Sequence, residues 1–178
     1  KWKKENYQEN WYIGETLIAA IGQGYVLSTP LQLAVMIARI ASNGKKIEPS
    51  IYKSTKKKEF KKINLQGKYF ELVNNALYGV VNEQKGTAFK SKSDLYKFSG
   101  KTGTSQVKKI TIKEREKEDF RKKEKKWKNR DHAIFVGYMP SKQPKYAVSV
   151  IIEHGGSGAS VAAPIAKNIF DYLHKLKI

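Results

Sequence analysis

Four consecutive residues, Lys101-Thr102-Gly103-Thr104, place a cation, two hydroxyls and a bare backbone side by side in an extended segment, residues 96–107. An edge strand exposes unpaired N–H and C=O groups, so an extended peptide can pair with it, and Gly103 has no side chain to obstruct that approach. The hydroxyls of Thr102 and Thr104 can bind a carboxylate in the positive field of Lys101, and the Thr104 N–H could stabilise a developing oxyanion. The pattern suits an enzyme that docks a peptide carboxylate along a strand and attacks a nearby carbonyl. An exposed strand with a merely solvated lysine explains these four residues equally well.

Two helices are predicted ahead of this segment. The first begins at Thr29-Pro30-Leu31-Gln32, where Thr29 and Gln32 form a capping box and Pro30 fits the first helical position, and it ends at Asn43-Gly44. Its expected apolar stripe is Leu33, Ile37, Ile40 and Ala41. The second helix shows a helical apolar face and is broken by Gly86-Thr87-Ala88. That face consists of Tyr69, Leu72, Val73, Ala76, Leu77, Val80 and Val81.

The segments around these helices are predicted to be irregular. Residues 11–29 are rich in glycine and aromatics and indicate a structured loop that turns at Gly14, Gly22 and Gly24. Residues 45–67 are expected to form a short strand and a basic loop.

Strands are predicted at residues 96–107, 132–138 and 146–153, and turn residues between Pro140 and Pro144 join the last two as an antiparallel hairpin. Residues 147–152 are nearly all apolar, which favours a central strand covered on both faces. After a loop at residues 155–158 the chain closes with a helix that has Pro164 in its first turn. Its expected apolar stripe is Val161, Ile165, Ile169, Leu173 and Leu176. The fold class is therefore α+β, an antiparallel sheet with helices packed on it.

The composition narrows the class of partner. With 178 residues, the chain is one domain or a large part of one. Lys and Arg outnumber Asp and Glu by 35 to 16, which gives a formal net charge of +19 and points to an anionic partner. Residues 108–130, however, hold twelve of the basic and five of the acidic residues. We interpret them as a charged insertion between two strands. Because aromatics do not alternate with basic residues, we expect no nucleic-acid partner.

Other features of the sequence exclude some chemistries. There is no cysteine, which excludes disulfides and thiol chemistry. No apolar run could span a bilayer, and no signal peptide is present. The sequence begins at Lys1 rather than Met, so we expect it to be a piece of a longer product. His132, His154 and His174 lack metal-ligand spacing, and we interpret His132 and His154 as structural hydrogen-bonding residues.

Several further motifs accompany the Lys-Thr-Gly triplet. They are Trp11-Tyr-x-Gly14-Glu-Thr16, Ile21-Gly-Gln-Gly-Tyr25, Thr29-Pro-Leu-Gln-Leu-Ala34, Gly79-Val-Val-Asn-Glu-Gln-Lys-Gly-Thr-Ala88, Gly100-Lys-Thr-Gly-Thr-Ser-Gln-Val107, Arg130-Asp-His-Ala133 and Glu153-His-Gly-Gly-Ser-Gly158. In this order, they resemble the transpeptidase domain of class B penicillin-binding proteins, in particular the penicillin-binding protein 2 group of rod-shaped bacteria, and the resemblance covers nearly the whole chain. The triplet itself is a signature of serine penicillin-binding proteins and β-lactamases.

The resemblance implies roles for particular residues. Lys101, Thr102 and Gly103 match the third active-site motif of the family, and Thr104 matches the position whose backbone N–H forms half of the oxyanion hole. Thr102 and Thr104 would hold the terminal carboxylate of a D-Ala-D-Ala stem peptide or of a β-lactam. Residues 22–25 would form a buried structural loop that supports the site.

The family's other two motifs, a Ser-x-x-Lys that opens a helix and a Ser-x-Asn, are expected upstream of residue 11. Ser-x-Asn does not occur here. Four stretches match the letters of Ser-x-x-Lys, and they begin at Ser42, Ser50, Ser54 and Ser105. None of these serines is predicted to open a helix, where the lysine amine could take the hydroxyl proton. We therefore expect the C-terminal portion of a transpeptidase domain, with the nucleophilic serine outside residues 1–178.

The function that the resemblance implies is peptidoglycan cross-linking during cell-wall elongation, without a cofactor. The expected partners are the stem peptide, β-lactams, the upstream remainder of the domain, and the glycosyltransferase and scaffold proteins of a membrane-bound elongation complex. The expected location is the periplasmic face of a bacterial inner membrane. The alternatives are a β-lactamase-like hydrolase, against which the motifs at residues 22–25 and 29–34 argue, and a non-enzymatic basic binding module.

Overall fold

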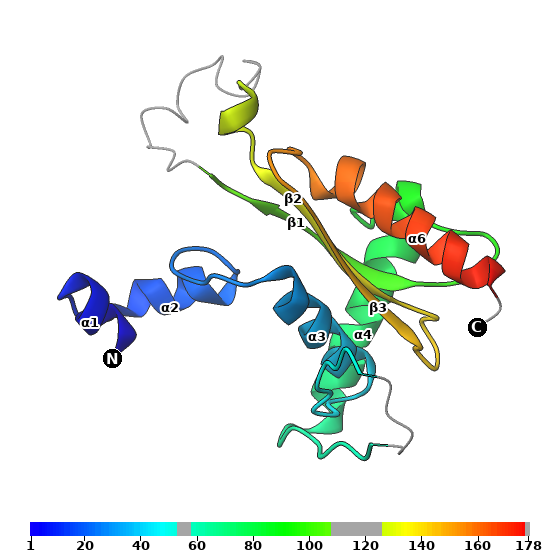
Figure 1. Ribbon diagram of the computed structural model, residues 1–178, viewed down its shortest axis with the longest axis horizontal. Helices are drawn as coiled ribbons and strands as arrows, with labels where there is room; N and C mark the ends of the chain where they lie inside the picture. The colour runs from blue at the N-terminus through cyan, green and yellow to red at the C-terminus, as the bar shows by residue number, and fades with distance from the viewer. Residues whose placement is uncertain (53–57, 108–125, 177–178) are drawn as a thin grey trace.

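The computed structural model describes residues 1–52, 58–107 and 126–176, and it combines helices with one antiparallel sheet (Figure 1). This arrangement confirms the predicted α+β class. In chain order the elements are α1 Trp2–Tyr7, α2 Ile13–Ala20, α3 Pro30–Ala41, α4 Gly67–Asn82, η1 Phe89–Ser91, β1 Ser99–Ser105, η3 Trp127–Asn129, β2 His132–Met139, β3 Tyr146–Ile152, η4 Gly158–Ala162 and α6 Ala163–Lys175. Among the described residues, no helix is both long and apolar enough to cross a membrane.

The sheet has the strand order β1-β2-β3, and both pairs are antiparallel. The three predicted strands and the hairpin between β2 and β3 are therefore confirmed. The prediction that residues 147–152 form a central strand is wrong within the described sheet, because β2 is central and β3 lies at an edge. The apolar run in β3 reflects contacts with α3 and α6 on its two faces, and Ala147 stays exposed.

Helices cover both faces of the sheet, α6 on one side and α3 with α4 on the other (Figure 1). Alternate residues of β2 point into the core layers on the two faces of the sheet, because successive side chains of a strand point to opposite faces. Phe135 packs with Phe98 and Phe170 on the α6 side, whereas Val136 and Tyr138 pack on the other side. The central strand thus anchors both halves of the core, and β1 is held against it.

Helix α3 forms as its cap residues predict. The Thr29 Oγ1 accepts a hydrogen bond from the Gln32 N–H at 3.2 Å, and the Thr29 N–H donates to Gln32 Oε1 at 2.8 Å. The chain leaves the helix through Asn43 and Gly44, whose φ angles of 54° and 83° are left-handed. Within the predicted stripe Ile37 and Ala41 are buried, and the other two members pack beside them.

Helices α4 and α6 are confirmed, but their predicted buried faces are partly wrong. In α4 the buried apolar residues are Phe70, Leu77 and Val81, while Leu72 and Val73 are exposed. In α6 the residues that pack on the sheet are Ala163, Ala166 and Phe170, and the predicted Ile165 and Ile169 lie at the margin with 37% of their surface exposed. Because alanine side chains are small, α6 lies close to the sheet along its alanine face. The larger isoleucines therefore lie beside this face and do not point at the sheet.

Residues 11–29 depart from the predicted loop because they contain α2. The Tyr12 N–H donates to Glu15 Oε2 at 2.7 Å and caps the helix start. Gly14 lies inside the helix, where its missing side chain faces open space. Gly22 and Gly24 do form turns, with φ angles of 73° and 78°. Figure 1 shows α1 and α2 extending away from the sheet.

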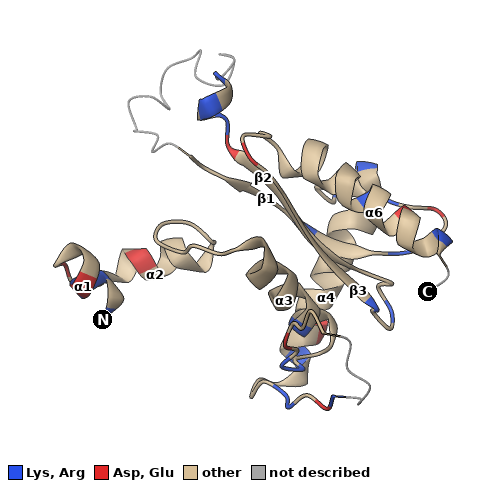
Figure 2. Ribbon diagram, in the orientation of Figure 1, with Lys and Arg blue, Asp and Glu red and all other residues tan. Residues whose placement is uncertain are grey.

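The predicted short strand in residues 45–67 reduces to one antiparallel bridge, between Lys45 and Lys62. Residues 53–57 of this segment lie outside the described part of the chain, as do residues 108–125 of the charged insertion. In Figure 2 the charged residues that are drawn lie mostly in loops and near helix ends.

Candidate active site

The Lys101–Thr104 segment lies in the middle of β1, paired along one side with β2 from Val136 to Ala133. Because β1 is the edge of the described sheet, its other side faces no strand in that part of the chain. Strand alternation places Thr102 and Thr104 on one face and Lys101 on the other. Thr104 is exposed and Thr102 is half-buried. The two hydroxyl side chains thus lie on a strand that has one edge without a strand partner among the described residues, as an extended peptide ligand requires.

The Lys101 side chain is exposed, and its Nζ donates to the Thr102 carbonyl oxygen at 2.7 Å. A lysine ammonium has three donors, so this bond leaves capacity for an anionic ligand. The cation lies along its own strand and gives the exposed edge a positive field.

Thr87 is a neighbour of Thr102 that the sequence analysis does not predict. Its Oγ1 lies 2.8 Å from the Oγ1 of Thr102, and either hydroxyl could be the donor. Residues 86–88 both break the predicted helix and belong to one of the motifs of the family resemblance, but neither signal predicts that Thr87 contacts Thr102. Asn82, at the end of α4, donates from Nδ2 to the Phe98 carbonyl at 2.9 Å and holds this end of the helix against the chain entering β1.

Gly158 is a second residue whose importance the sequence interpretation missed. It is buried at the start of η4, where a Cβ would overlap the carbonyl oxygens of Gly103 and Ile134. Only glycine permits this approach, so the loop at residues 155–158 packs η4 against the middle of the Lys-Thr-Gly segment.

The two histidines next to this loop, His132 and His154, both make hydrogen bonds within the described structure. The His154 N–H donates to His132 Nδ1 at 2.9 Å, and His154 Nδ1 lies 3.0 Å from the Arg130 carbonyl oxygen. The Trp127 ring lies against His154, with centroids 4.5 Å apart. In the described ranges no group of His, Asp or Glu residues is arranged to hold a metal ion.

The prediction that residues 22–25 form a buried loop is wrong for the described structure, where this loop is largely exposed. Its tyrosine, Tyr25, instead joins an aromatic cluster of the α1–α2 arm. The Tyr25 ring centroid lies 5.7 Å from that of Trp2, 5.1 Å from that of Tyr7 and 6.4 Å from that of Trp11.

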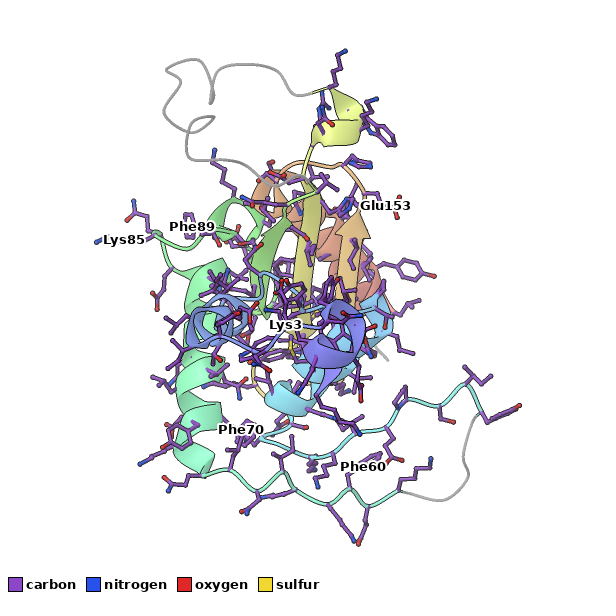
Figure 3. The ribbon with its side chains drawn as sticks, turned by 90° about the vertical axis from the view of Figure 1, so that its left-hand side faces the viewer. Lys3, Phe60, Phe70, Lys85, Phe89 and Glu153 are labelled. Carbon is purple, nitrogen blue, oxygen red and sulfur yellow. The ribbon has the colours of Figure 1, made fainter. Side chains whose placement is uncertain are left out.

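Lys3, labelled in Figure 3, belongs to α1 of the same arm, and only 3% of its surface is exposed. Its Nζ lies 2.6 Å from Glu15 Oε1 and 3.1 Å from Glu9 Oε2 and donates to the Asn10 carbonyl at 3.0 Å. Burial alone would lower the pKa of Lys3, but the hydrogen bonds to Glu15 and Glu9 outweigh it and raise that pKa. The bond from Lys3 correspondingly lowers the pKa of Glu15.

Three of the four serines that spell Ser-x-x-Lys lie in the described part of the chain. Ser42 follows the end of α3, Ser50 lies in a loop and Ser105 ends β1. None of these three opens a helix, and Ser54 lies outside the described residues.

The comparisons with known proteins agree with this geometry. The family model described as "Penicillin binding protein transpeptidase domain" matches residues 3–171. The chain belongs to the penicillin-binding protein transpeptidase family. The peptidoglycan D,D-transpeptidase MrdA of Haemophilus influenzae is 35% identical over 97% of this chain and 28% of its own length. MrdA of Acinetobacter baumannii is 37% identical over 97% of this chain and 26% of its own length. This transpeptidase segment thus spans little more than a quarter of those relatives.

Solved structures of the family extend the likeness to the fold. The penicillin-binding protein PBP2 of Helicobacter pylori, in a complex with MreC, superposes with a TM-score of 0.79 at 30% identity, over 98% of this chain and 30% of that one. PBP2 of Pseudomonas aeruginosa, in complex with WCK 5153, gives a TM-score of 0.74 at 34% identity, over 97% of this chain and 36% of that one. The fold is therefore that of penicillin-binding transpeptidases.

Proposed function

We propose that this chain is the C-terminal part of the transpeptidase domain of a peptidoglycan D,D-transpeptidase that acts in cell-wall elongation. The observation that carries the proposal is the edge of β1 that has no strand partner among the described residues and carries Lys101, Thr102 and Thr104, in a member of this family. The relatives named as D,D-transpeptidases match it over nearly its whole length.

The proposed reaction is a two-step acyl transfer. A serine oxygen adds to the carbonyl carbon of the penultimate D-Ala of a stem peptide, the C–N bond to the terminal D-Ala breaks, and the hydroxyl proton ends on the departing amine. The side-chain amine of a second stem then attacks the ester carbonyl. It gives a proton to the serine oxygen and forms the cross-link. A β-lactam would acylate the same serine through its ring amide.

In this proposal β1 binds the donor peptide as an added strand. The Thr102 and Thr104 hydroxyls bind its terminal carboxylate, to which Lys101 contributes positive charge. The Thr104 N–H supplies part of the oxyanion hole, a donor whose removal typically raises a barrier by about 3 kcal/mol. Gly103 leaves the strand surface open to the peptide backbone.

The nucleophilic serine is proposed to come from outside residues 1–178. The relatives are more than three times as long as the matched region. The serines of this chain that precede a lysine by three positions, where they are described, do not open helices. The exposed apolar side chains of α2, Ile13 and Leu17 among them, would be covered in such a larger domain.

The proposed surroundings are those of an elongation complex at the periplasmic face of a bacterial inner membrane. The Helicobacter pylori relative was solved with MreC, which favours an equivalent scaffold protein as a partner here. We extend the proposal to β-lactams as inhibitors and to a rod-shape glycosyltransferase as a neighbour.

Acylation of the full-length protein by a fluorescent penicillin tests this function. We expect Lys101→Ala to lower the second-order acylation constant about 10- to 100-fold, because hydrogen bonds to charged groups contribute on the order of 1.5–3 kcal/mol. Lys142→Ala is the matched control, since it removes an exposed cation from the β2–β3 turn. Absence of any acylation, or equal loss in both variants, would refute the proposal. Continuous nitrocefin turnover without a stable acyl-enzyme would indicate a β-lactamase instead.

A further inference from the structure

Three threonine hydroxyls gather at the exposed edge of β1. Thr102 and Thr104 share one strand face, and Thr87 reaches Thr102 from the turn after α4 with an Oγ1–Oγ1 distance of 2.8 Å. Thr87 itself is exposed. It lies 15 residues before Thr102 in the chain, so the contact between the two hydroxyls is a tertiary contact.

The position of Thr87 is set by its two neighbours. A Cβ on Gly86 would overlap the carbonyl oxygens of Gly79 and Val80, so the turn closes directly onto the end of α4. The Gly86 N–H donates to the Glu83 carbonyl at 2.8 Å, and the Ala88 N–H donates to the Val80 carbonyl at 2.9 Å. Ala88 is buried in the core.

Thr87 is thus held between the tight turn at Gly86 and the buried side chain of Ala88. In Figure 3 Lys85 projects away from the sheet from the same turn, whereas Phe89 lies closer to the strands.

When an anion is bound, the number of hydroxyl protons decides which of Thr87 and Thr102 donates the hydrogen bond between them. Each hydroxyl has one proton to donate, and an ionised carboxylate can only accept. If the Thr102 hydroxyl donates to a carboxylate, it has no proton left for Thr87. The 2.8 Å contact must then run from the Thr87 O–H to Thr102 Oγ1. A hydroxyl that accepts such a bond is polarised into a stronger donor.

We infer that Thr87 is a positioning residue for the carboxylate subsite, donating to Thr102 so that the Thr102 proton points at the substrate carboxylate. This inference rests on the proposed function. Within that function it predicts that Thr87 contributes selectively to ligands with a free carboxylate, through Thr102.

The test compares benzylpenicillin with its methyl ester on the full-length protein. Thr87→Val keeps the side-chain shape but removes the hydroxyl, and we expect it to lower the acylation constant for the acid roughly five- to tenfold, the loss of one hydrogen bond. The constant for the ester should change less than twofold, since the ester is uncharged and a weaker acceptor. Thr87→Ser should restore the acid constant to within about twofold of the original protein.

Two further variants separate this role from a merely structural one. In a Thr102→Val background, Thr87→Val should cause no additional loss, because the bond it removes no longer exists. Gln84→Ala, an exposed change in the same turn, should leave both constants unaltered.

Three outcomes would overturn the inference. The first is an equal loss for acid and ester. The second is additive losses in the double variant, and the third is Thr87→Val acting like the original protein on the acid. If the original protein is not acylated by either ligand, the proposed function fails together with this inference.

Discussion

At the scale of single residues, the candidate site depends on atoms that only glycine leaves accessible. A Cβ on Gly103 would lie 3.2 Å from the Ile134 Cβ, and Gly158 allows η4 to lie directly against the Gly103 backbone. Neighbours of the Lys-Thr-Gly segment thus help to set its shape. The sequence identifies Lys101 to Thr104 because cation, hydroxyls and glycine adjoin each other there. It does not reveal Thr87 or Gly158 as neighbours, because both reach the strand through tertiary packing.

Gly158 offers a test of this close packing. We expect Gly158→Ala to destabilise the full-length protein by about 1–3 kcal/mol, since its Cβ would overlap two backbone oxygens that cannot move independently of the sheet. The penicillin acylation constant should fall with it, because β1 would shift. Thermal denaturation and acylation kinetics measure the two effects.

Gly67→Ala is the matched control for that experiment. Gly67 is exposed at the start of α4, with open space where a Cβ would sit, so the substitution should stabilise the protein by up to about 1 kcal/mol. Equal stability changes for the two alanine variants would contradict the packing account.

At the scale of elements, local sequence signals predict where most helices and strands begin and end. They do not predict which face of a helix is buried or which strand is central. The capping box at Thr29 and Gln32 correctly locates the start of α3, because both hydrogen bonds form between residues three apart. The face of α6 is different, because it depends on what the sheet offers. Alanines at 163 and 166 fit closely, so the isoleucine stripe that periodicity favours lies to one side.

Hydrophobicity likewise misplaced β3 at the centre of the sheet. An apolar strand can be covered by helices on both faces and still have an unpaired edge in the described structure, as β3 does between α3 and α6. Glycine content likewise predicts a turn at Gly14, but this residue lies inside α2, whose start is capped by the bond from the Tyr12 N–H to Glu15. The pairing order of strands is settled only in the assembled chain, whereas the Tyr12–Glu15 bond is as local as the bonds between Thr29 and Gln32.

A clamp formed by Tyr96, Lys167 and Asp171 joins the segment before β1 to α6, and it gives a pH-dependent prediction. Tyr96, just before β1, donates from its hydroxyl to Asp171 Oδ1 at 2.7 Å, and Lys167 Nζ lies 2.7 Å from Asp171 Oδ2. Partial burial alone would raise the pKa of Asp171, but the bonds from Lys167 and Tyr96 outweigh it and hold that pKa below its usual value. Burial and the bond to Asp171 raise the pKa of Tyr96. The clamp therefore favours an ionised Asp171 and a neutral Tyr96.

A folded-state pKa below the unfolded one stabilises the fold at pH values above the unfolded pKa, and this stabilisation disappears as the pH falls through the folded value. We expect Asp171→Asn to cost about 1–2 kcal/mol at pH 7. The cost should shrink as the pH falls below about 4, where an ordinary carboxyl protonates.

Thermal denaturation of the full-length protein between pH 7 and pH 3 measures this cost. Asp94→Asn, which alters an exposed carboxylate in the segment before β1, is the matched control and should leave stability nearly unchanged at every pH. A cost for Asp171→Asn that stays constant down to pH 3 would show that the clamp does not depend on ionisation.

At the scale of the whole molecule, the described residues form a sheet that is covered on both faces and an arm, α1 and α2, that exposes apolar side chains. The β1–β2–β3 sheet has a core layer on each face, whereas α1 and α2 expose large apolar side chains, among them Ile13 and Ile21. Lys3 and its two carboxylate partners give this arm an internal polar anchor. In the proposed transpeptidase the sheet supplies the wall that holds the substrate, and a segment outside residues 1–178 supplies the serine that attacks it.

The most direct test of this division is to locate the acylated residue. The full-length protein would be labelled with benzylpenicillin and digested, and the modified peptide would be identified by mass spectrometry. We predict a single modified serine outside residues 1–178, followed by a lysine three positions later, and no labelling of the isolated 178-residue chain. Modification of Ser42, Ser50, Ser54, Ser105 or any other serine within residues 1–178 would contradict the account.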